Sequence, residues 1–321
     1  MIIKRSAEFQ IIDEFFERQA SQHQPASVIV GIGDDCAVLA PNANAEQVIS
    51  VDTSIAGRHF PEDAAAYDIA YRSLNVALSD LAAMGAKPCW FTLALSLNHH
   101  DKNWLQDFSK GLFEAASHAN IALIGGDTTK VPENAPLSIT VQVHGEVPFG
   151  KALLRQGAKV GDKLYVSNCL GDAAAGLLCY QQGLHYPDLL RAYLRPEPQI
   201  TLGLHLQDHA HSCIDISDGL LADLGHILQR SGIGAEIDLQ SIPLSESLLS
   251  YCDRKKALGL ALSGGDDYQL LFSSDQVISM DNVTVIGRII DKTGIHLLND
   301  DDNISQTLSM TGFDHFYEPS V

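Results

Sequence analysis

Short acidic turns recur along this chain, and each places an aspartate beside glycine, serine or threonine. They are GIGDD at 31–35, SVDT at 50–53, SD at 79–80, GGDTT at 125–129, DISDG at 215–219 and SGGDD at 263–267. An acidic side chain on a tight, glycine-permitted turn is poor core material, but its oxygens suit hard cations and, through them, phosphate groups. The set predicts a magnesium–nucleotide site assembled from residues along the whole chain.

The composition is acidic. The 321 residues include 40 Asp plus Glu against 21 Lys plus Arg, which gives a net charge of −19, and 28 of the 40 acids are the short Asp that suits a rigid metal site. A negative field of this size argues against nucleic acid as a partner, because phosphate backbones are bound by clustered Lys and Arg. A solvated acidic surface remains the alternative for part of this charge, as at residues 300–302.

The cysteines and the hydropathy pattern indicate the cellular compartment of the protein. The six cysteines form no CxxC pair, which favours reduced thiols of a cytosolic protein over a zinc site or a disulfide framework. The opening segment MIIKRSAEFQIIDEFF has no continuous apolar stretch after its basic pair, and no segment approaches the roughly 20 apolar residues of a membrane span. We therefore expect a cytoplasmic protein with no membrane partner.

Strand-like and helix-like patterns alternate throughout, which predicts an α+β or α/β architecture. The expected helices cover about 7–20, 68–85, 104–119, an Ala-rich segment after the Gly-Asp turn at 171–172, further segments to about 211, and a helix from Leu220. The expected strands are VIVGIG running on into CAVLA, VISVD, FTLALSL, IALIGG, LSITVQVHGEV, KLYVSN, CIDIS, AEIDL, YQLLFS and VTVIGRI. The Gly-rich basic segment 148–162 predicts a boundary between domains 1–150 and 151–321.

Several acidic turns also have an ordinary structural explanation. GIGDDCAV could be a hairpin turn whose aspartates cap exposed N–H groups, and SVDT could be the end of a strand. IGGDTT is typical of a strand that ends in two glycines. The N–H groups and hydroxyls that follow could hold a phosphate or could simply close a turn.

Three segments are harder to explain in this way. Asp80 shares its helix with neighbouring leucines and should be half-buried, where an unpaired carboxylate is costly and favours a cation. Asp215 and Asp218 lie on either side of a strand-to-helix junction, with Ser217 placed to cap the helix. Capping needs one acceptor, whereas this junction offers three. In SGGDDY, two adjacent carboxylates should repel each other unless a ligand binds there.

The chain resembles the thiamine-monophosphate kinase family in an ordered set of segments that covers nearly its full length. These are GIGDD, VDT, AGRHF, SDLAAMGAKP, LIGGDTT, RQGAKVGD, DISDGLLADLGHI and LSGGDDY. AGRHF and SDLAAMGA favour this branch over aminoimidazole ribonucleotide synthetase, selenophosphate synthetase and a hydrogenase maturation factor, which share its fold. The resemblance implies a two-lobed aminoimidazole ribonucleotide synthetase-like fold, α+β or α/β, in which each lobe is a mixed sheet covered by helices. The N-terminal domain would bind ATP and magnesium and dimerise, and the C-terminal domain would complete the active site.

The resemblance also implies roles for particular residues. Positions that hold several magnesium ions in the family match Asp35, Ser50, Val51, Asp52, Asp80, Asp127, Asp215 and Asp218. Positions that contact ATP match Gly126, Asp127, Arg155 and Ser217. The carboxylates expected to be catalytic are Asp35, Asp80, Asp127 and Asp218. The expected substrate contacts are His59, Asp266 and Met310, of which the last two stand where the family commonly has glutamate and an aromatic residue.

The implied activity is the ATP-dependent phosphorylation of thiamine monophosphate to thiamine diphosphate by direct in-line transfer, assisted by several magnesium ions, in a homodimer. The acceptor is already an ionised phosphate, so no strong general base is needed, and Arg155 would supply a direct positive charge. One alternative is another ATP-dependent enzyme of the same fold, although selenophosphate synthesis is disfavoured because an N-terminal redox-active Cys is absent. Another is a non-catalytic acidic metal-binding protein, disfavoured by Arg155 and by the absence of an EF-hand loop.

Overall fold

The chain divides into two compact units in the computed structural model, which describes residues 7–98 and 101–301. The first unit consists of Met1–Leu81 with Ala86–Gly150, and the second consists of Ala82–Gly85 with Lys151–Val321. Within the described ranges, no helix combines the length and apolar character needed to cross a bilayer.

The first unit begins with a continuous helical segment, as expected over about 7–20. It consists of α1 (Ala7–Ile11), η1 (Ile12–Glu17), α2 (Arg18–Ala20) and η2 (Ser21–His23). η1 has the wider π-type turn, and it buries Phe15 and Phe16. Strands β1 (Val28–Val30) and β2 (Val38–Leu39) then pair antiparallel, so GIGDD lies in the connection of a hairpin.

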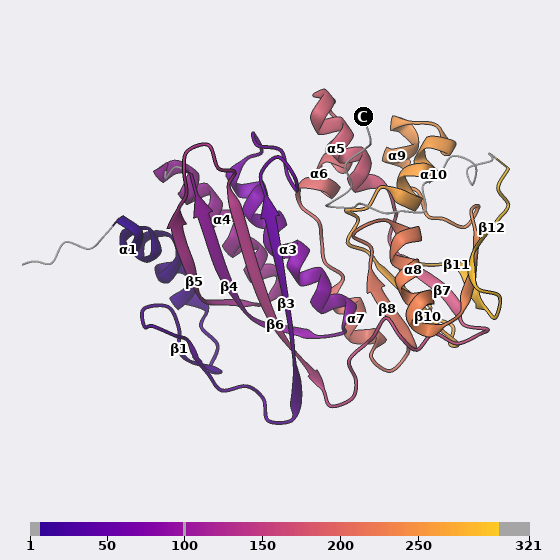
Figure 1. Ribbon diagram of the computed structural model, residues 1–321, viewed down its shortest axis with the longest axis horizontal. Helices are drawn as coiled ribbons and strands as arrows, with labels where there is room; N and C mark the ends of the chain where they lie inside the picture. The colour runs from indigo at the N-terminus through magenta and orange to yellow at the C-terminus, as the bar shows by residue number, and fades with distance from the viewer. Residues whose placement is uncertain (1–6, 99–100, 302–321) are drawn as a thin grey trace, which may run out of the picture. The chain divides into compact units, whose positions relative to one another are not determined.

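A four-stranded mixed sheet in the order β3-β6-β4-β5 forms the centre of the first unit (Figure 1). Its strands are β3 (Ala45–Ile55), β4 (Lys87–Leu97), β5 (Ala122–Lys130) and β6 (Ser138–Pro148). Helices α3 (Ala66–Ala83) and α4 (Lys102–Ala119) cover one face. On that face alternate residues such as Val141 and Val143 are buried, whereas Gln142 and Thr92 on the other face are half-buried. The strands and helices expected in this half are confirmed, with longer bounds for β3 and β4 and shorter bounds for β1 and β2.

Strand β5 differs from the expectation that it ends at its two glycines. It continues through Gly126 to Lys130 and stays paired with β4, and Ile124 bulges out of the ladder. Gly126 has φ +150°, and a Cβ there would lie 1.8 Å from the carbonyl oxygen of Leu93. The glycine therefore permits a close approach of two strands rather than a turn.

The second unit contains a six-stranded mixed sheet in the order β12-β9-β11-β7-β10-β8. Its strands are β7 (Lys163–Ser167), β8 (Ser212–Asp215), β9 (Gly234–Asp238), β10 (Leu270–Ser274), β11 (Val283–Ile290) and β12 (Gly294–Leu298). Its helices are α5 (Asp172–Gln182), α6 (Pro187–Leu194), α7 (Ile200–Leu206), α8 (Leu220–Ser231), α9 (Glu246–Tyr251) and α10 (Arg254–Ser263). The expected elements are confirmed, but α9, α10 and β12 were not predicted.

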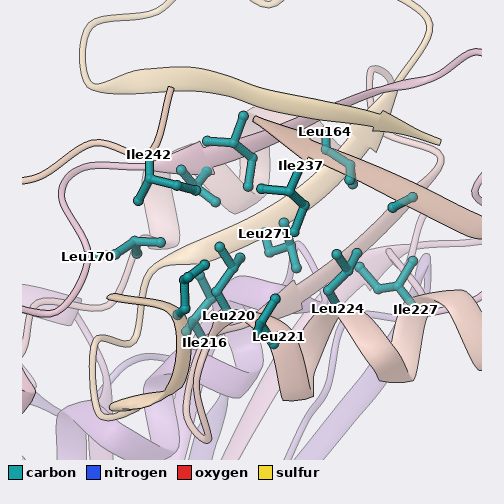
Figure 2. Close-up of a cluster of buried hydrophobic side chains, with 14 of the residues drawn as sticks. Leu164, Leu170, Ile216, Leu220, Leu221, Leu224, Ile227, Ile237, Ile242 and Leu271 are labelled. Atoms are coloured by element: carbon teal, nitrogen blue, oxygen red, sulfur yellow. The ribbon is translucent and has the colours of Figure 1, made fainter. Parts of the chain in front are cut away.

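The core of the second unit lies between its sheet and α8 (Figure 2). Leu220, Leu221, Leu224 and Ile227 have the spacing of one helical face, and they pack in the same cluster as Leu271 of β10. Each unit is thus a mixed sheet with packed helices, which confirms the predicted fold class.

Candidate functional site

Ser50 and Asp80 meet in the first unit. Ser50 lies in β3 opposite the buried Val143 of β6, and Asp80 lies near the end of α3, half-buried as expected. The Ser50 hydroxyl donates a hydrogen bond to Oδ2 of Asp80. A carboxylate has about four lone-pair sites, so this bond leaves acceptor capacity for a further ligand.

Three further candidates follow Ser50 in the chain. Asp52 lies two residues along β3, on the same face as Ser50, and is half-buried. Val51 is 57% exposed and its side chain has no ligand atom, so a metal contact there could involve only its carbonyl oxygen. His59 lies in the turn after β3, where its Nδ1 is 3.0 Å from the backbone N–H of Ile55, which donates to it.

The other first-unit candidates, Asp35 and Asp127, are exposed. Asp35 lies in the β1–β2 connection, where its backbone N–H donates to Oδ1 of Asp34 at 2.8 Å. Asp127 lies in the edge strand β5, and two strands separate β5 from β3, a span of about 14 Å at the usual strand spacing. The first unit therefore does not bring Asp127 next to Asp52.

In the second unit, the segment 215–218 lies beside the segment 266–269. Asp215 ends β8 and is 5% exposed. Three backbone hydrogen bonds of 2.8 Å join the segments, from Ile216 N to Gln269 O, from Tyr268 N to Ile216 O, and from Asp266 N to Ser217 O. Backbone hydrogen bonds thus hold the segment expected to bind metal beside the segment expected to contact substrate.

The expected capping of α8 by Ser217 is wrong. Gly219 occupies the N-cap position, with no side-chain capping bond. Instead Asp223, inside the helix, accepts hydrogen bonds through Oδ2 from the backbone N–H groups of Ser217 (3.0 Å) and Asp218 (3.1 Å). Asp223 is 2% exposed, and burial, followed by the nearby charge of Asp215, raises its pKa to about 7.

The two adjacent carboxylates of SGGDDY have different partners. Asp267 is buried and accepts from the N–H groups of Gly171 (2.9 Å) and Ala173 (3.4 Å) at the start of α5. Burial raises its pKa to about 8, although these hydrogen bonds act in the opposite direction. Asp266 has φ +66° and accepts from the hydroxyl of Tyr268 at 2.9 Å. Groups within the protein thus donate hydrogen bonds to both carboxylates, and a bound ligand at this pair stays a prediction.

Arg155 lies exposed in the segment between β6 and β7. The backbone next to it is fixed, since the carbonyl of Leu154 accepts from Cys213 N at 2.9 Å. Farther along, Asp162 is 1% exposed and lies 2.9 Å from Nδ1 of His211. The segment thus presents a guanidinium to solvent from an anchored backbone.

The donor chemistry fits magnesium. Within 7–98 and 101–301, no group of three or more His, Cys, Asp or Glu residues is close enough to hold a metal ion. The described units instead offer smaller sets of hard oxygen donors, namely Ser50 with Asp80 and the carboxylates of the 215–218 segment. Buried like charges at Asp215 and Asp223 are an arrangement that a cation would relieve. Met310 lies outside the described residues.

Sequence reasoning missed the roles of Asp223 and Asp267. Asp223 lies between Leu220 and Ile227 at the spacing of the buried face of α8, and an acid at such a position is a detectable signal. The burial of Asp267 cannot be predicted in this way, because the sequence of two adjacent aspartates does not indicate which side chain is buried.

The sequence matches two family models. The model described as AIR synthase related protein, N-terminal domain, matches residues 33–147, and the corresponding C-terminal domain model matches residues 159–297. The thiamine-monophosphate kinase of Escherichia coli (strain K12) is 43% identical over 97% of this chain and 99% of its own length. That of Haemophilus influenzae is 42% identical over 97% and 98%.

Solved structures agree with this similarity. The crystal structure of thiamine-monophosphate kinase from Stenotrophomonas maltophilia K279a has a TM-score of 0.81 and 43% identity, and the match covers 91% of this chain and 96% of that one. A structure described as AaThiL complexed with AMPPCP and TMP has a TM-score of 0.77 and 28% identity, with coverage of 98% and 100%.

Proposed function

Because this chain belongs to the thiamine-monophosphate kinase family of AIR synthase related proteins, we propose that it transfers the terminal phosphoryl group of ATP to thiamine monophosphate, yielding ADP and thiamine diphosphate. The observation that carries this proposal is the 43% identity to a thiamine-monophosphate kinase over 97% of the chain. The two family models span the acidic turns of both units, from Asp35 to Asp266. The related structure with AMPPCP, a non-hydrolysable ATP analogue, and TMP supports the same pair of substrates.

The proposed transfer is direct and in-line. Such a reaction requires mainly positioning and neutralisation of the phosphate charge, so little covalent chemistry falls to the protein. The acceptor oxygen already carries negative charge, and no histidine of the chain is needed as a base. Arg155, exposed on its anchored segment, would place its guanidinium against a phosphate.

The carboxylates would act through several magnesium ions. Magnesium, when bound, supplies positive charge to the phosphate oxygens that would otherwise be repelled by the aspartates. The proposed holders are Asp35, Ser50, Val51 through its carbonyl oxygen, Asp52, Asp80, Asp127, Asp215 and Asp218. Their oxygen-only donor set is the one that magnesium prefers over softer ligands.

The remaining candidates would contact the nucleotide and the acceptor. Gly126 and Ser217 would contact ATP through segments whose backbones are fixed, by the close strand pairing in β5 and by the hydrogen bonds of Asp223 and Asp266. His59 and Asp266 would orient the acceptor, and the Tyr268 hydroxyl donates a hydrogen bond to Asp266. Met310 would contribute to the thiamine side.

A cytoplasmic homodimer joined through the first unit is part of the proposal. The face of the β3-β6-β4-β5 sheet that α3 and α4 do not cover carries Ile49 and Val51, which are 56% and 57% exposed. Two neighbouring exposed apolar residues on a sheet face that no helix covers support an interface with a second copy. The face also carries the polar residues Thr92 and Gln142, which lie opposite each other in β4 and β6.

Product analysis tests the reaction. Purified protein is incubated with ATP, millimolar magnesium and, in separate reactions, thiamine monophosphate, thiamine and other phosphorylated vitamins, and the products are separated chromatographically. We expect thiamine diphosphate and ADP in equal amounts from thiamine monophosphate alone, and a large loss of both in Asp218→Asn purified in the same way. Turnover of a different acceptor without thiamine diphosphate would favour a sister enzyme of this fold.

A further inference from the structure

Asp223 is a buried acid that none of the proposed binding roles uses. It is 2% exposed and lies one turn into α8. Its neighbours in the chain, Leu220, Leu221 and Leu224, pack into the core (Figure 2). Burying a carboxylate is costly unless it is hydrogen-bonded, so its partners identify what it does.

The partners are the backbone N–H groups of two proposed ligands. Ser217 N lies 3.0 Å and Asp218 N lies 3.1 Å from the same oxygen, Oδ2. An acceptor that receives two successive N–H groups fixes the orientation of the peptide plane between them, and hence the direction in which the two side chains leave the backbone.

The turn is fixed from its other side as well. The carbonyl of Ser217 accepts from Asp266 N at 2.8 Å, and a Cβ on Gly265 would lie 2.5 Å from that carbonyl oxygen. Gly219 has φ +113° and its Cα faces the backbone of Ser263 so closely that a Cβ would be 2.9 Å from the Ser263 Cα. The side chain of Asp223 and the backbone of residues 263–266 therefore both constrain residues 217–219.

We infer that Asp223 is a positioning residue for the magnesium–nucleotide site, in which its Oδ2 holds the Ser217–Asp218 turn in the conformation that receives the phosphates. The inference rests on the proposed function, because that function assigns Ser217 to ATP and Asp218 to metal. It assigns Asp223 no contact with either ligand. Asp223 contributes one oxygen, Oδ2, placed to accept both backbone N–H groups.

Because a single oxygen accepts both hydrogen bonds, the effect of these bonds can be measured apart from the effect of the carboxylate charge. In Asp223→Asn the amide oxygen can take the place of Oδ2 and accept both N–H groups, while the negative charge is gone. In Asp223→Ala both donors lose their acceptor. The full-length protein and both variants are compared for binding of AMPPCP with magnesium by calorimetry, for the KM of ATP and kcat, and for thermal melting.

We expect Asp223→Ala to weaken AMPPCP binding and raise the KM of ATP at least about tenfold, as loss of a hydrogen bond to a charged acceptor implies. Asp223→Asn should stay within about threefold of the wild type. Asp101 provides a matched control, since its Oδ1 accepts from Asn103 N (2.7 Å) and Trp104 N (2.9 Å) at the start of α4. Asp101→Ala should lower the melting temperature and leave the KM of ATP unchanged.

Each contrary outcome has a distinct meaning. Wild-type binding in Asp223→Ala, an equal loss in Asp223→Asn, or an equal rise of KM in Asp101→Ala would overturn the positioning role. A wild-type protein that binds AMPPCP but forms no thiamine diphosphate would overturn the proposed reaction and leave the role of Asp223 standing. A wild-type protein that binds no nucleotide would overturn both.

Discussion

The hydroxyl of Ser50 donates a hydrogen bond to the carboxylate of Asp80, and this bond joins strand β3 to the C-terminal part of α3. Asp80 was expected to need a cation because it is half-buried. The serine supplies a neutral donor instead, which makes the carboxylate tolerable in the absence of metal while leaving acceptor sites open. Stability and ligand binding can therefore be separated at this residue.

Asp80→Asn should abolish most activity without destabilising the ligand-free protein. The amide can still accept from Ser50, and a half-buried negative charge is removed. In the wild type, magnesium with AMPPCP at a hundredfold excess over Kd should stabilise the fold by about 2.7 kcal/mol. Thermal melting with and without these ligands checks this, and equal ligand-induced shifts in the two proteins would make Asp80 a structural residue.

Gly126→Ala should destabilise the first unit by at least about 1–3 kcal/mol and weaken nucleotide binding. Its Cβ would lie 1.8 Å from Leu93 O, and its φ of +150° is unfavourable for alanine. Gly125→Ala is the matched control, because a Cβ on Gly125 would meet no atom within 4 Å beyond its two chain neighbours. Urea unfolding of both variants measures the difference, and equal midpoints would contradict the close approach seen in β5.

Asp267→Asn should change how stability depends on pH. The folded-state pKa of Asp267 is raised to about 8 from an ordinary value of 3.8, so its favourable contribution is present at low pH and is lost as pH rises toward 8. The wild type should lose stability relative to Asp267→Asn between about pH 5.5 and pH 8, by at most about 1.4 kcal/mol per pH unit. Denaturant titrations at the two pH values measure this.

Asp238 is the control for that titration. Hydrogen bonds from Asn299, then Ser241, lower the pKa of its carboxyl, so its contribution is complete above pH 3.8 and is lost only under more acidic conditions. Asp238→Asn should therefore differ from the wild type by the same amount at both pH values. A wild type that gains stability relative to Asp267→Asn on going to pH 8 would show that the hydrogen bonds at α5 outweigh burial.

Ile49→Lys should convert a dimer into a monomer without unfolding it. The side chain is 56% exposed on the uncovered sheet face, so lysine is tolerated in the isolated chain but would be buried without a partner between two copies. Light scattering at micromolar concentration measures the mass. Val277→Lys is the control, since Val277 is 76% exposed in the second unit, and its mass should equal that of the wild type. A monomeric wild type would contradict the proposed interface.

Periodicity was sufficient for the longer helices and strands that bury one face. The alternation in 138–148 and the apolar spacing in 104–119 and 220–231 correspond to β6, α4 and α8, because each of these elements buries one face against a neighbour. The short helices α9 and α10 and the edge strand β12 were missed. They are only five to ten residues long, and their apolar residues take partners from distant parts of the chain.

The acidic turns show where local reasoning fails. Ser217 was expected to cap α8, but Gly219 occupies that position, and the backbone N–H groups of Ser217 and Asp218 donate to Asp223 inside the helix. Gly126 looked like the end of a strand, but its conformation serves close pairing with β4. Candidate residues can thus be found from their types and spacing, whereas the group that satisfies each backbone N–H depends on tertiary contacts.

The four residues 82–85 have a consequence for dissecting the protein. They belong to the second unit, where Ala82 packs in one cluster with Leu202 and Leu206, Leu153 N donates to Met84 O, and Gln207 donates to Gly85 O. A recombinant fragment that starts at Lys151 would lack this segment and leave an apolar surface and two backbone-directed donors without their partners. Expression of the halves as separate polypeptides should therefore yield an aggregation-prone C-terminal piece. Limited proteolysis near residue 150 should instead leave the two pieces associated.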